Sequence, residues 1–318
     1  MSITVIDLDS PVLVVGATGT VGGAVLEVLP EHGATVRVLV RARRSGGFGA
    51  DVQQVSGDLG DEASLRRALT GVRAALYVSP HAHEEIAYAE NFIRACEATG
   101  TRIVFVGLHI SSRTYASRLQ RKMLQLMFPS YAPKLHVGQL IAASRTDPVV
   151  LTPIHLFQND EIFRDDLSRG LFPMPMRSVN RVDVHDVAEI AAQALLRPAF
   201  PVAEQVIAGP ESLSAADCAR IWTEESGRPV QAGFAGDVDW DVLTSNRLSG
   251  QKAHDFRNVH LALRRRGWPA TAEQIRQTTD LLGRSPRRYR DYVAEILGVA
   301  EVADRLDENA ESSLRAAA

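Results

Sequence analysis

Residues 13–23 read LVVGATGTVGG and place three glycines, Gly16, Gly19 and Gly22, at intervals of three residues. The run 12–15 is continuous, apolar and rich in valine, which is typical of a strand buried on both faces of a parallel sheet. Residues 20–29 combine small side chains with an amphipathic pattern, which is typical of a helix packed close to that strand. The stretch therefore predicts a strand, a glycine turn and a helix in succession.

This turn has two interpretations. Its spacing is close to the G-x-G-x-x-G pattern of dinucleotide-binding turns, although one such match alone is weak. Glycine adopts positive φ and lets the backbone approach a pyrophosphate, while the helix N-terminus offers unpaired N–H groups and a partial positive charge. A tight turn without a ligand is the alternative, which the flanking strand and helix make less favoured. We predict a dinucleotide site whose contacts include Gly16, Thr18, Gly19, Thr20, Val21 and Gly22.

Composition excludes several other classes of protein. The 318 residues, 45% of them hydrophobic, can form one large α/β domain with a smaller appendage. A net charge of −3 gives no global basic field for nucleic acid or an acidic membrane. No apolar run is long enough to span a bilayer and the N-terminus does not resemble a signal peptide, so a cytoplasmic location is expected. Cys96 and Cys218 lie in helical patterns without metal-ligand spacing, and we expect core thiols and no metal site.

Apolar runs and helical patterns alternate along the first half of the chain, which predicts a doubly wound parallel sheet. Strands are expected at 11–15, 35–40, 52–55, 73–79, 102–106 and 148–152, with helices at 20–30, 61–70, 83–98 and about 134–144. Farther on we expect a helix at 186–196, a strand at 204–208, and two helices opened by the capping boxes 214–217 and 271–274. The expected division is a Rossmann domain over 1–155, an interleaved C-terminal part over 156–306 covering the substrate cleft, and a flexible tail over 307–318.

The type of cofactor can be inferred from the end of the second strand. An NAD site commonly has an acidic residue there, whereas this chain has Arg41 and Arg43, which could pair with the 2′-phosphate of NADP. A solvated basic loop is the alternative. Asp58, beside Leu59 after the third strand, could meet the adenine or cap the helix that begins near residue 61. Ser79 and Pro80, after the fourth strand, complete the predicted cofactor contacts.

Five segments together resemble the NmrA-like branch of the atypical, extended short-chain dehydrogenase/reductase family. They are GATGTVG at 16–22, LVRARR at 39–44, GDLGD at 57–61, RVDVHDVAEIAAQAL at 181–195 and LLGRSPRRYRDYVAEIL at 281–297. The resemblance extends over about residues 11–297. It implies a Rossmann domain that holds NADP(H), with a smaller C-terminal part over the nicotinamide end of the cleft. Members include quinone and ketone reductases and also cofactor-sensing regulators without catalytic activity.

The chain departs from the family's catalytic pattern. The family commonly has a serine after the fifth strand and a Y-x-x-x-K pair, in which the lysine lowers the pKa of the tyrosine. Here the fifth strand leads into Gly107-Leu108-His109, and Tyr131 is followed by Lys134 one position early, with Leu135 in the lysine position. On a helix that slip rotates a side chain by about 100°, unless Pro133 starts the helix and resets its register. Tyr131 and Lys134 remain candidate catalytic residues on this basis.

The loop after the sixth strand, TPIHLFQN at 152–159, matches the loop that lines the family's substrate pocket. His155 is our candidate proton donor there, because imidazole titrates near neutral pH, although a histidine packed in a loop is the alternative. His109, His155, Phe157 and Asn159 are the predicted substrate contacts. An additional amphipathic helix is expected at about 112–130, as a lid, a homodimer contact or packing on the domain.

Two functions remain open at this point. One is an NADPH-dependent reductase of a carbonyl or quinone group on a hydrophobic, aromatic small molecule. The other is a non-catalytic NADP(H)-sensing regulator. The complete cofactor turn and the pocket loop favour the enzyme, and no basic recognition element indicates nucleic-acid binding.

Overall fold

The computed structural model describes residues 10–41, 47–49, 51–111, 131–233, 247, 248 and 250–298, and the single positions 119, 122, 125 and 244. The helix expected at 112–130 therefore lies almost wholly outside the described residues, and so does the tail expected at 307–318. Arg43 also lies outside them.

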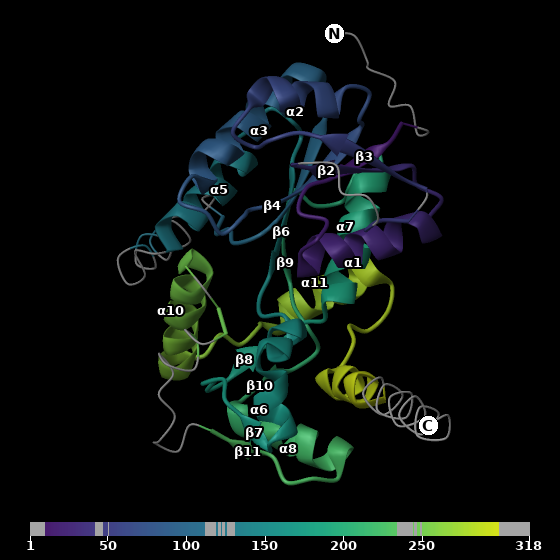
Figure 1. Cartoon of the computed structure of the whole chain (residues 1–318). Helices are drawn as coiled ribbons and strands as arrows, with labels where there is room; N and C mark the ends of the chain where they lie inside the picture. Colours follow the sequence, from purple (N-terminus) through teal and green to yellow (C-terminus); the bar gives the residue numbers. More distant parts are fainter. Residues whose placement is uncertain are drawn as a thin grey trace, which may run out of the picture.

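The centre of the molecule is a seven-stranded parallel sheet in the order β3-β2-β1-β4-β5-β6-β9 (Figure 1). Its strands are β1 Val12–Val14, β2 Val36–Val40, β3 Val52–Ser56, β4 Ala74–Val78, β5 Arg102–Val106, β6 Val149–Pro153 and β9 Glu204–Ile207. The order reverses between β1 and β4, as in a Rossmann fold, so this is the switch point beside which ligands bind. The predicted fold class is confirmed.

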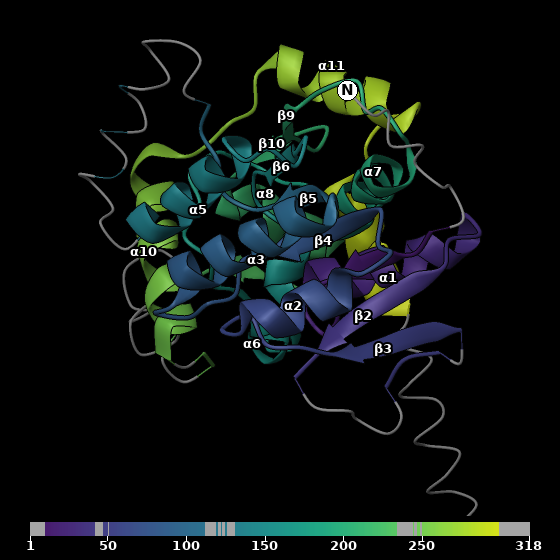
Figure 2. The same ribbon diagram turned by 90° about the horizontal axis from the view of Figure 1, so that it is seen from above.

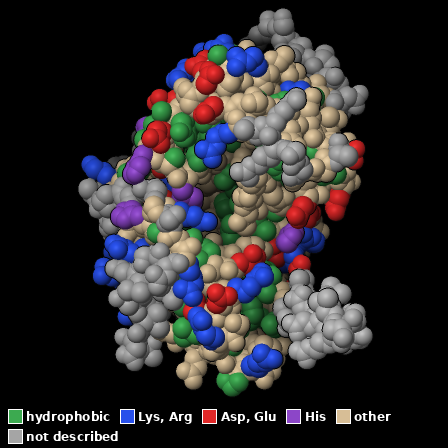
Figure 3. Space-filling view, in the orientation of Figure 1, with side chains coloured by type: hydrophobic (Ala, Val, Ile, Leu, Met, Phe, Trp, Pro, Cys, Tyr) green, Lys and Arg blue, Asp and Glu red, His purple; other side chains and the backbone are tan. Residues whose placement is uncertain are grey.

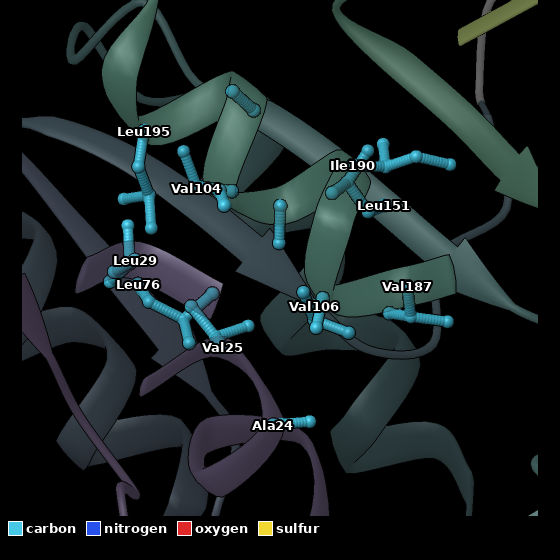
Figure 4. Close-up of a cluster of buried hydrophobic side chains, with 14 of the residues drawn as sticks. Ala24, Val25, Leu29, Leu76, Val104, Val106, Leu151, Val187, Ile190 and Leu195 are labelled. Atoms are coloured by element: carbon cyan, nitrogen blue, oxygen red, sulfur yellow. The ribbon is translucent and has the colours of Figure 1, made fainter. Parts of the chain in front are cut away.

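Helices cover both faces of this sheet, as Figure 2 shows from above. One face carries α1 (Thr20–Glu31), α7 (Val184–Leu196) and α11 (Ala272–Leu282), and the other carries α2 (Glu62–Leu69), α3 (Glu85–Thr99) and α5 (Ala132–Ala142). Figure 4 shows the core between α1 and α7, where Val25 and Leu29 of α1 lie near Leu76 and Leu195, and Ile190 of α7 lies beside Leu151. We call the sheet with these six helices the Rossmann body.

The remaining described elements form a smaller C-terminal body. They are η2 Phe157–Phe163, α6 Arg164–Ser168, β7 Leu171–Phe172, β8 Val179–Asn180, β10 Ser212–Leu213, α8 Ala215–Ser226, β11 Gln231–Ala232, α10 Gly250–Arg266 and the helical residues 289–298. This body has its own hydrophobic cluster, in which Phe157, Phe163 and Phe172 are fully buried. The chain passes between the two bodies repeatedly, because α7, β9 and α11 return to the sheet.

Capping residues set several helix ends, as the sequence indicated. Both expected capping boxes are present, at the starts of α8 and α11. Helix α7 begins at Val184, two residues earlier than expected, because the Asp183 carboxylate accepts a hydrogen bond from the His185 N–H. Cys96 and Cys218 are free and buried, which confirms the expectation of core thiols.

An ion pair lies fully buried in the C-terminal body. Arg181 donates to both carboxylate oxygens of Asp160, with N···O distances of 2.5 and 3.1 Å. The Tyr289 hydroxyl also donates to Asp160, and it accepts a 2.7 Å hydrogen bond from the indole of Trp222. Such a pair needs all its partners, because a buried charge left alone is costly. The network therefore connects η2, β8, α8 and the helical residues 289–298.

Candidate functional site

The glycine turn between β1 and α1 has the conformation that a phosphate cradle requires. Gly16 has a φ of +78°, a region that residues with a side chain rarely adopt. A Cβ added to Gly22 would lie 2.2 Å from the Gly16 carbonyl oxygen, so only glycine allows α1 to pack this close to the turn. Thr18, Gly19 and Thr20 are exposed, whereas Val21 packs partly against the core.

The N-terminus of α1 is suited to an anion. Among the described residues no side chain caps it, and its first turn contains no acidic residue. Side chains cap α2, α7, α8 and α11, whereas, within the described part of the chain, α3 and α5 share with α1 the lack of a side-chain cap. The start of α1 is exposed at Gly19 and Thr20 and has no carboxylate in its first turn, so its free N–H groups and the positive end of the helix dipole suit a pyrophosphate.

The other predicted cofactor residues lie along the same carboxyl edge of the sheet. Arg41 is exposed one residue after β2. Ser79 and Pro80 follow β4, next to the strand that leads into the glycine turn.

The residues after β3 form a separate turn along this edge. Leu59 is partly buried against the core. Asp58 is exposed and accepts a 2.7 Å hydrogen bond from the Gly60 N–H. It does not cap α2, because Asp61 accepts the bond from the Ala63 N–H and is the cap. That alternative for Asp58 was wrong, and its carboxylate instead stabilises the turn after β3.

Lys134 lies between two buried carboxylates. Its Nζ is 3.1 Å from Glu85 on α3 and 3.3 Å from Asp255 on α10. The Ser79 hydroxyl donates to Glu85 at 3.0 Å, and the His81 Nδ1 lies 3.0 Å from the Asp255 carboxylate. We call these five residues the Lys134 cluster. It joins the end of β4, α3 and α5 of the Rossmann body to α10 of the C-terminal body.

Tyr131 has a different partner from the one that the family mechanism needs. Its hydroxyl donates a 3.0 Å hydrogen bond to the main-chain carbonyl of Asp255. Burial, followed by the nearby Asp255 charge, raises the pKa of Tyr131 far above its ordinary value. Helix α5 begins at Ala132, with Pro133 in its first turn. Lys134 nevertheless forms ion pairs with Glu85 and Asp255, and Leu135 is buried. No depressed tyrosine pKa results from this arrangement.

His155 follows β6 and is 6% exposed. Its Nε2 lies 3.1 Å from the Nε2 of His260 on α10, and the side-chain nitrogen of Asn159 is 3.4 Å from the same atom. Burial, then the charges of Arg181 and His260, holds the pKa of His155 well below its ordinary value. At neutral pH the ring is therefore uncharged, and it carries a single proton.

The two remaining predicted substrate residues are more deeply placed than expected. Phe157 is fully buried, with its ring 5.2 Å from that of Tyr289, and belongs to the core of the C-terminal body. His109 is buried against α5 and lies 3.3 Å from the carboxylate of Glu204 on β9. Of the predicted pocket residues, His155 and Asn159 are thus the two that the structure brings together.

Figure 3 shows a hollow between the two bodies, with hydrophobic side chains on its floor. The parallel strands of the Rossmann body end toward the C-terminal body, and ligands of such sheets bind outside the carboxyl ends of the strands. The arrangement can hold a dinucleotide along the edge and an apolar molecule beyond it.

A family model, the NmrA-like family, matches residues 9–237. The chain belongs to the NmrA-like family. An NAD(P)H azoreductase of Xenophilus azovorans is 27% identical over 69% of this chain and 75% of its own length. The triphenylmethane reductase of Citrobacter sp. shares the fold, with a TM-score of 0.72 at 20% identity, over 91% of this chain and 99% of that one. NmrA, a negative transcriptional regulator solved in complex with NADP, has a TM-score of 0.69 at 14% identity, over 94% and 98% of the two chains.

Sequence reasoning missed four residues of this NmrA-like site: His81, Glu85, Asp255 and His260. The first two follow β4 and begin α3, and the others are on α10, so no local spacing relates them. The sequence of α10 is polar without a clear apolar stripe, and no helix was predicted there. Within the described residues no helix is long and apolar enough to cross a membrane.

Proposed function

We propose that the protein is an NADPH-dependent reductase of a carbonyl or quinone group on a hydrophobic, aromatic small molecule. The main support for this proposal is the conformation of the glycine turn, which suits binding of a dinucleotide. Gly16 has positive φ, α1 packs closely at Gly22, and no side chain among the described residues caps the start of α1. Relatives that are named as azo-dye and triphenylmethane reductases support a conjugated aromatic substrate.

Different residues would bind different parts of NADP(H). The main-chain N–H groups after Gly19 would hold the pyrophosphate, and Arg41 would pair with the 2′-phosphate of NADP(H). When bound, the nicotinamide supplies a hydride. The C-terminal part, residues 156–306, would cover the substrate end of the cleft and exclude water.

Proton transfer would not follow the tyrosine relay of the wider family. Tyr131 donates to a carbonyl and Lys134 is held by Glu85 and Asp255, so neither is free to protonate a substrate in this arrangement. A quinone or a ketone with a neighbouring phenol does not require a side-chain acid, because its own structure stabilises the developing charge. The protein would then contribute mainly by positioning.

An NADP(H)-sensing regulator is the second candidate. The observation that favours it is the same Lys134 cluster, because Glu85 and Asp255 hold the lysine nearest to the catalytic position while the glycine turn is complete. Such a protein would bind the cofactor tightly and oxidise none of it.

Two measurements separate these functions and test the cofactor. Calorimetric titration should give tighter binding of NADP(H) than of NAD(H), by about 1–3 kcal/mol for charge-assisted hydrogen bonds to the phosphate. Arg41→Ala should remove that preference, while Arg276→Ala on the exposed side of α11 should keep it. NADPH oxidation across quinones and polycyclic ketones then distinguishes an enzyme from a sensor. Equal affinities in the unmodified protein would contradict the NADP assignment.

A further inference from the structure

The His155–His260 contact fixes the position of a proton. Nδ1 of His260 lies 2.8 Å from the main-chain oxygen of Phe256. A carbonyl oxygen can only accept, so this Nδ1 carries a hydrogen. Burial lowers the pKa of His260 to about 4, so at neutral pH the ring has no second proton. Its Nε2 is therefore an acceptor.

The tautomer of His155 follows from that of His260. The two Nε2 atoms are 3.1 Å apart, and one of them must donate for the contact to be favourable. Because His260 accepts, the Nε2 of His155 donates. Because an amide N–H₂ only donates, the longer 3.4 Å contact from the Asn159 side-chain nitrogen is not a hydrogen bond to this protonated Nε2. The single proton of His155 is thus on Nε2, in a bond to α10.

The opposite nitrogen of His155 is consequently a lone-pair acceptor. Among the described residues it has no hydrogen-bond partner, although the ring is 6% exposed. A buried acceptor without a donor costs about 1–3 kcal/mol, so a hydrogen-bond donor from a bound molecule would be stabilising at this atom. His155 lies just beyond β6, at the edge of the sheet where the proposed substrate end of the cleft begins.

We infer that His155 accepts a hydrogen bond at Nδ1 from a hydroxyl or N–H group of the substrate, and so selects hydroxylated aromatic carbonyl compounds. His260 acts through His155 as a positioning residue. This inference rests on the proposed function and assigns His155 a role opposite to the proton donor expected from the sequence.

A kinetic comparison tests the selectivity. 6-Hydroxy-1,4-naphthoquinone and its 6-methoxy ether have similar shape, but only the first can donate, and its hydroxyl is too far from either carbonyl for an intramolecular hydrogen bond. The unmodified protein should favour the hydroxy compound roughly tenfold in kcat/KM, the size of one hydrogen bond. His155→Leu should bring the ratio close to one, whereas His155→Gln, whose amide oxygen accepts, should keep part of it. A ratio near one in the unmodified protein, or one that survives in His155→Leu, would overturn the inference.

Nitrogen NMR of histidine-labelled protein gives a readout that does not need turnover. In the complex with NADP⁺, 1-naphthol should shift the Nδ1 resonance of His155 toward a hydrogen-bonded value, and 1-methoxynaphthalene should not. His260→Gln, which keeps an acceptor for Nε2, should preserve the response. No shift with either compound would overturn the inference whatever the activity. If 1-naphthol shifts the resonance but no quinone is reduced by NADPH, the reductase function is contradicted, while His155 still binds a hydroxyl group.

Discussion

At the scale of single residues, binding of the cofactor depends first on Gly19. Its φ of −94° is allowed for any residue, but a Cβ there would lie 3.3 Å from the Gly16 carbonyl oxygen, on the exposed side of the turn. We expect Gly19→Val to abolish NADPH binding while the protein stays folded with a modestly lower melting temperature, because the side chain would occupy the place of the phosphate and press on the Gly16 carbonyl. Fluorescence titration and thermal unfolding measure the two effects.

Gly23→Ala is the matched control for this prediction. The added methyl group would be 3.5 Å from the Ala17 carbonyl oxygen, an ordinary contact, one turn farther along α1. This variant should bind NADPH as the unmodified protein does. Normal binding in a folded Gly19→Val protein would mean that the turn is structural only.

Tyr131 provides the residue-scale test of mechanism. A tyrosine that acts as a positioned general acid contributes about 10²-fold or more, or about 2.7 kcal/mol in the barrier. Because its hydroxyl donates to the Asp255 carbonyl, we expect Tyr131→Phe to reduce kcat less than tenfold. His155→Ala should reduce activity more. A collapse of kcat in Tyr131→Phe alone would restore the ordinary relay, and steady-state rates decide between the two.

At the scale of elements, α10 makes stability depend on pH. Burial lowers the pKa of His260 to about 4 and that of His155 in the same direction, whereas both would titrate near 6.5 in the unfolded chain. Between about pH 4 and 6.5 the unfolded chain therefore binds more protons than the folded protein, and stability rises with pH. For His260 the loss on acidification is on the order of 3 kcal/mol.

Chemical denaturation at a series of pH values measures this dependence. His260→Gln, which cannot titrate but still accepts from His155, should show a shallower loss of stability on acidification. An exposed variant, Arg228→Gln, should follow the unmodified protein. Equal slopes for His260→Gln and the unmodified protein would show that α10 does not hold a neutral histidine pair.

The same helix marks the limit of sequence reasoning. The seven strands of the central sheet and the helices α1, α2, α3 and α5 follow the alternation of strands and helices along the chain, and Asp183 caps α7, so all could be predicted within a few residues. Helix α10 lies outside that alternation, and its place is fixed by tertiary contacts of Asp255 and His260. Those contacts join residues more than 100 positions apart, which no local pattern encodes. The glycine turn was therefore predictable, but the Lys134 cluster was not.

At the scale of the whole molecule, the buried Arg181–Asp160 pair should control the stability of the C-terminal body. Arg181→Met would leave the Asp160 carboxylate buried without its cation. We expect this to lower the free energy of unfolding by about 3–5 kcal/mol. Adding Asp160→Leu should recover most of the loss. Arg290→Ala, which breaks an exposed pair, should change the denaturation midpoint little. A mild effect of Arg181→Met would mean that the network is not what holds this body together.

The central claim, hydride transfer from NADPH to an aromatic acceptor without a tyrosine relay, is tested most directly by isotope transfer. The protein would be mixed with NADPH deuterated at the nicotinamide C4 and, in turn, with polycyclic aromatic ketones and a cationic triphenylmethane dye. We expect one deuterium on the reduced carbon of at least one product, by mass spectrometry, and the same label in the product of Tyr131→Phe. Tight NADPH binding without labelled product from any acceptor would contradict the reductase and favour the sensor. Label that disappears only in Tyr131→Phe would contradict the proposed mechanism.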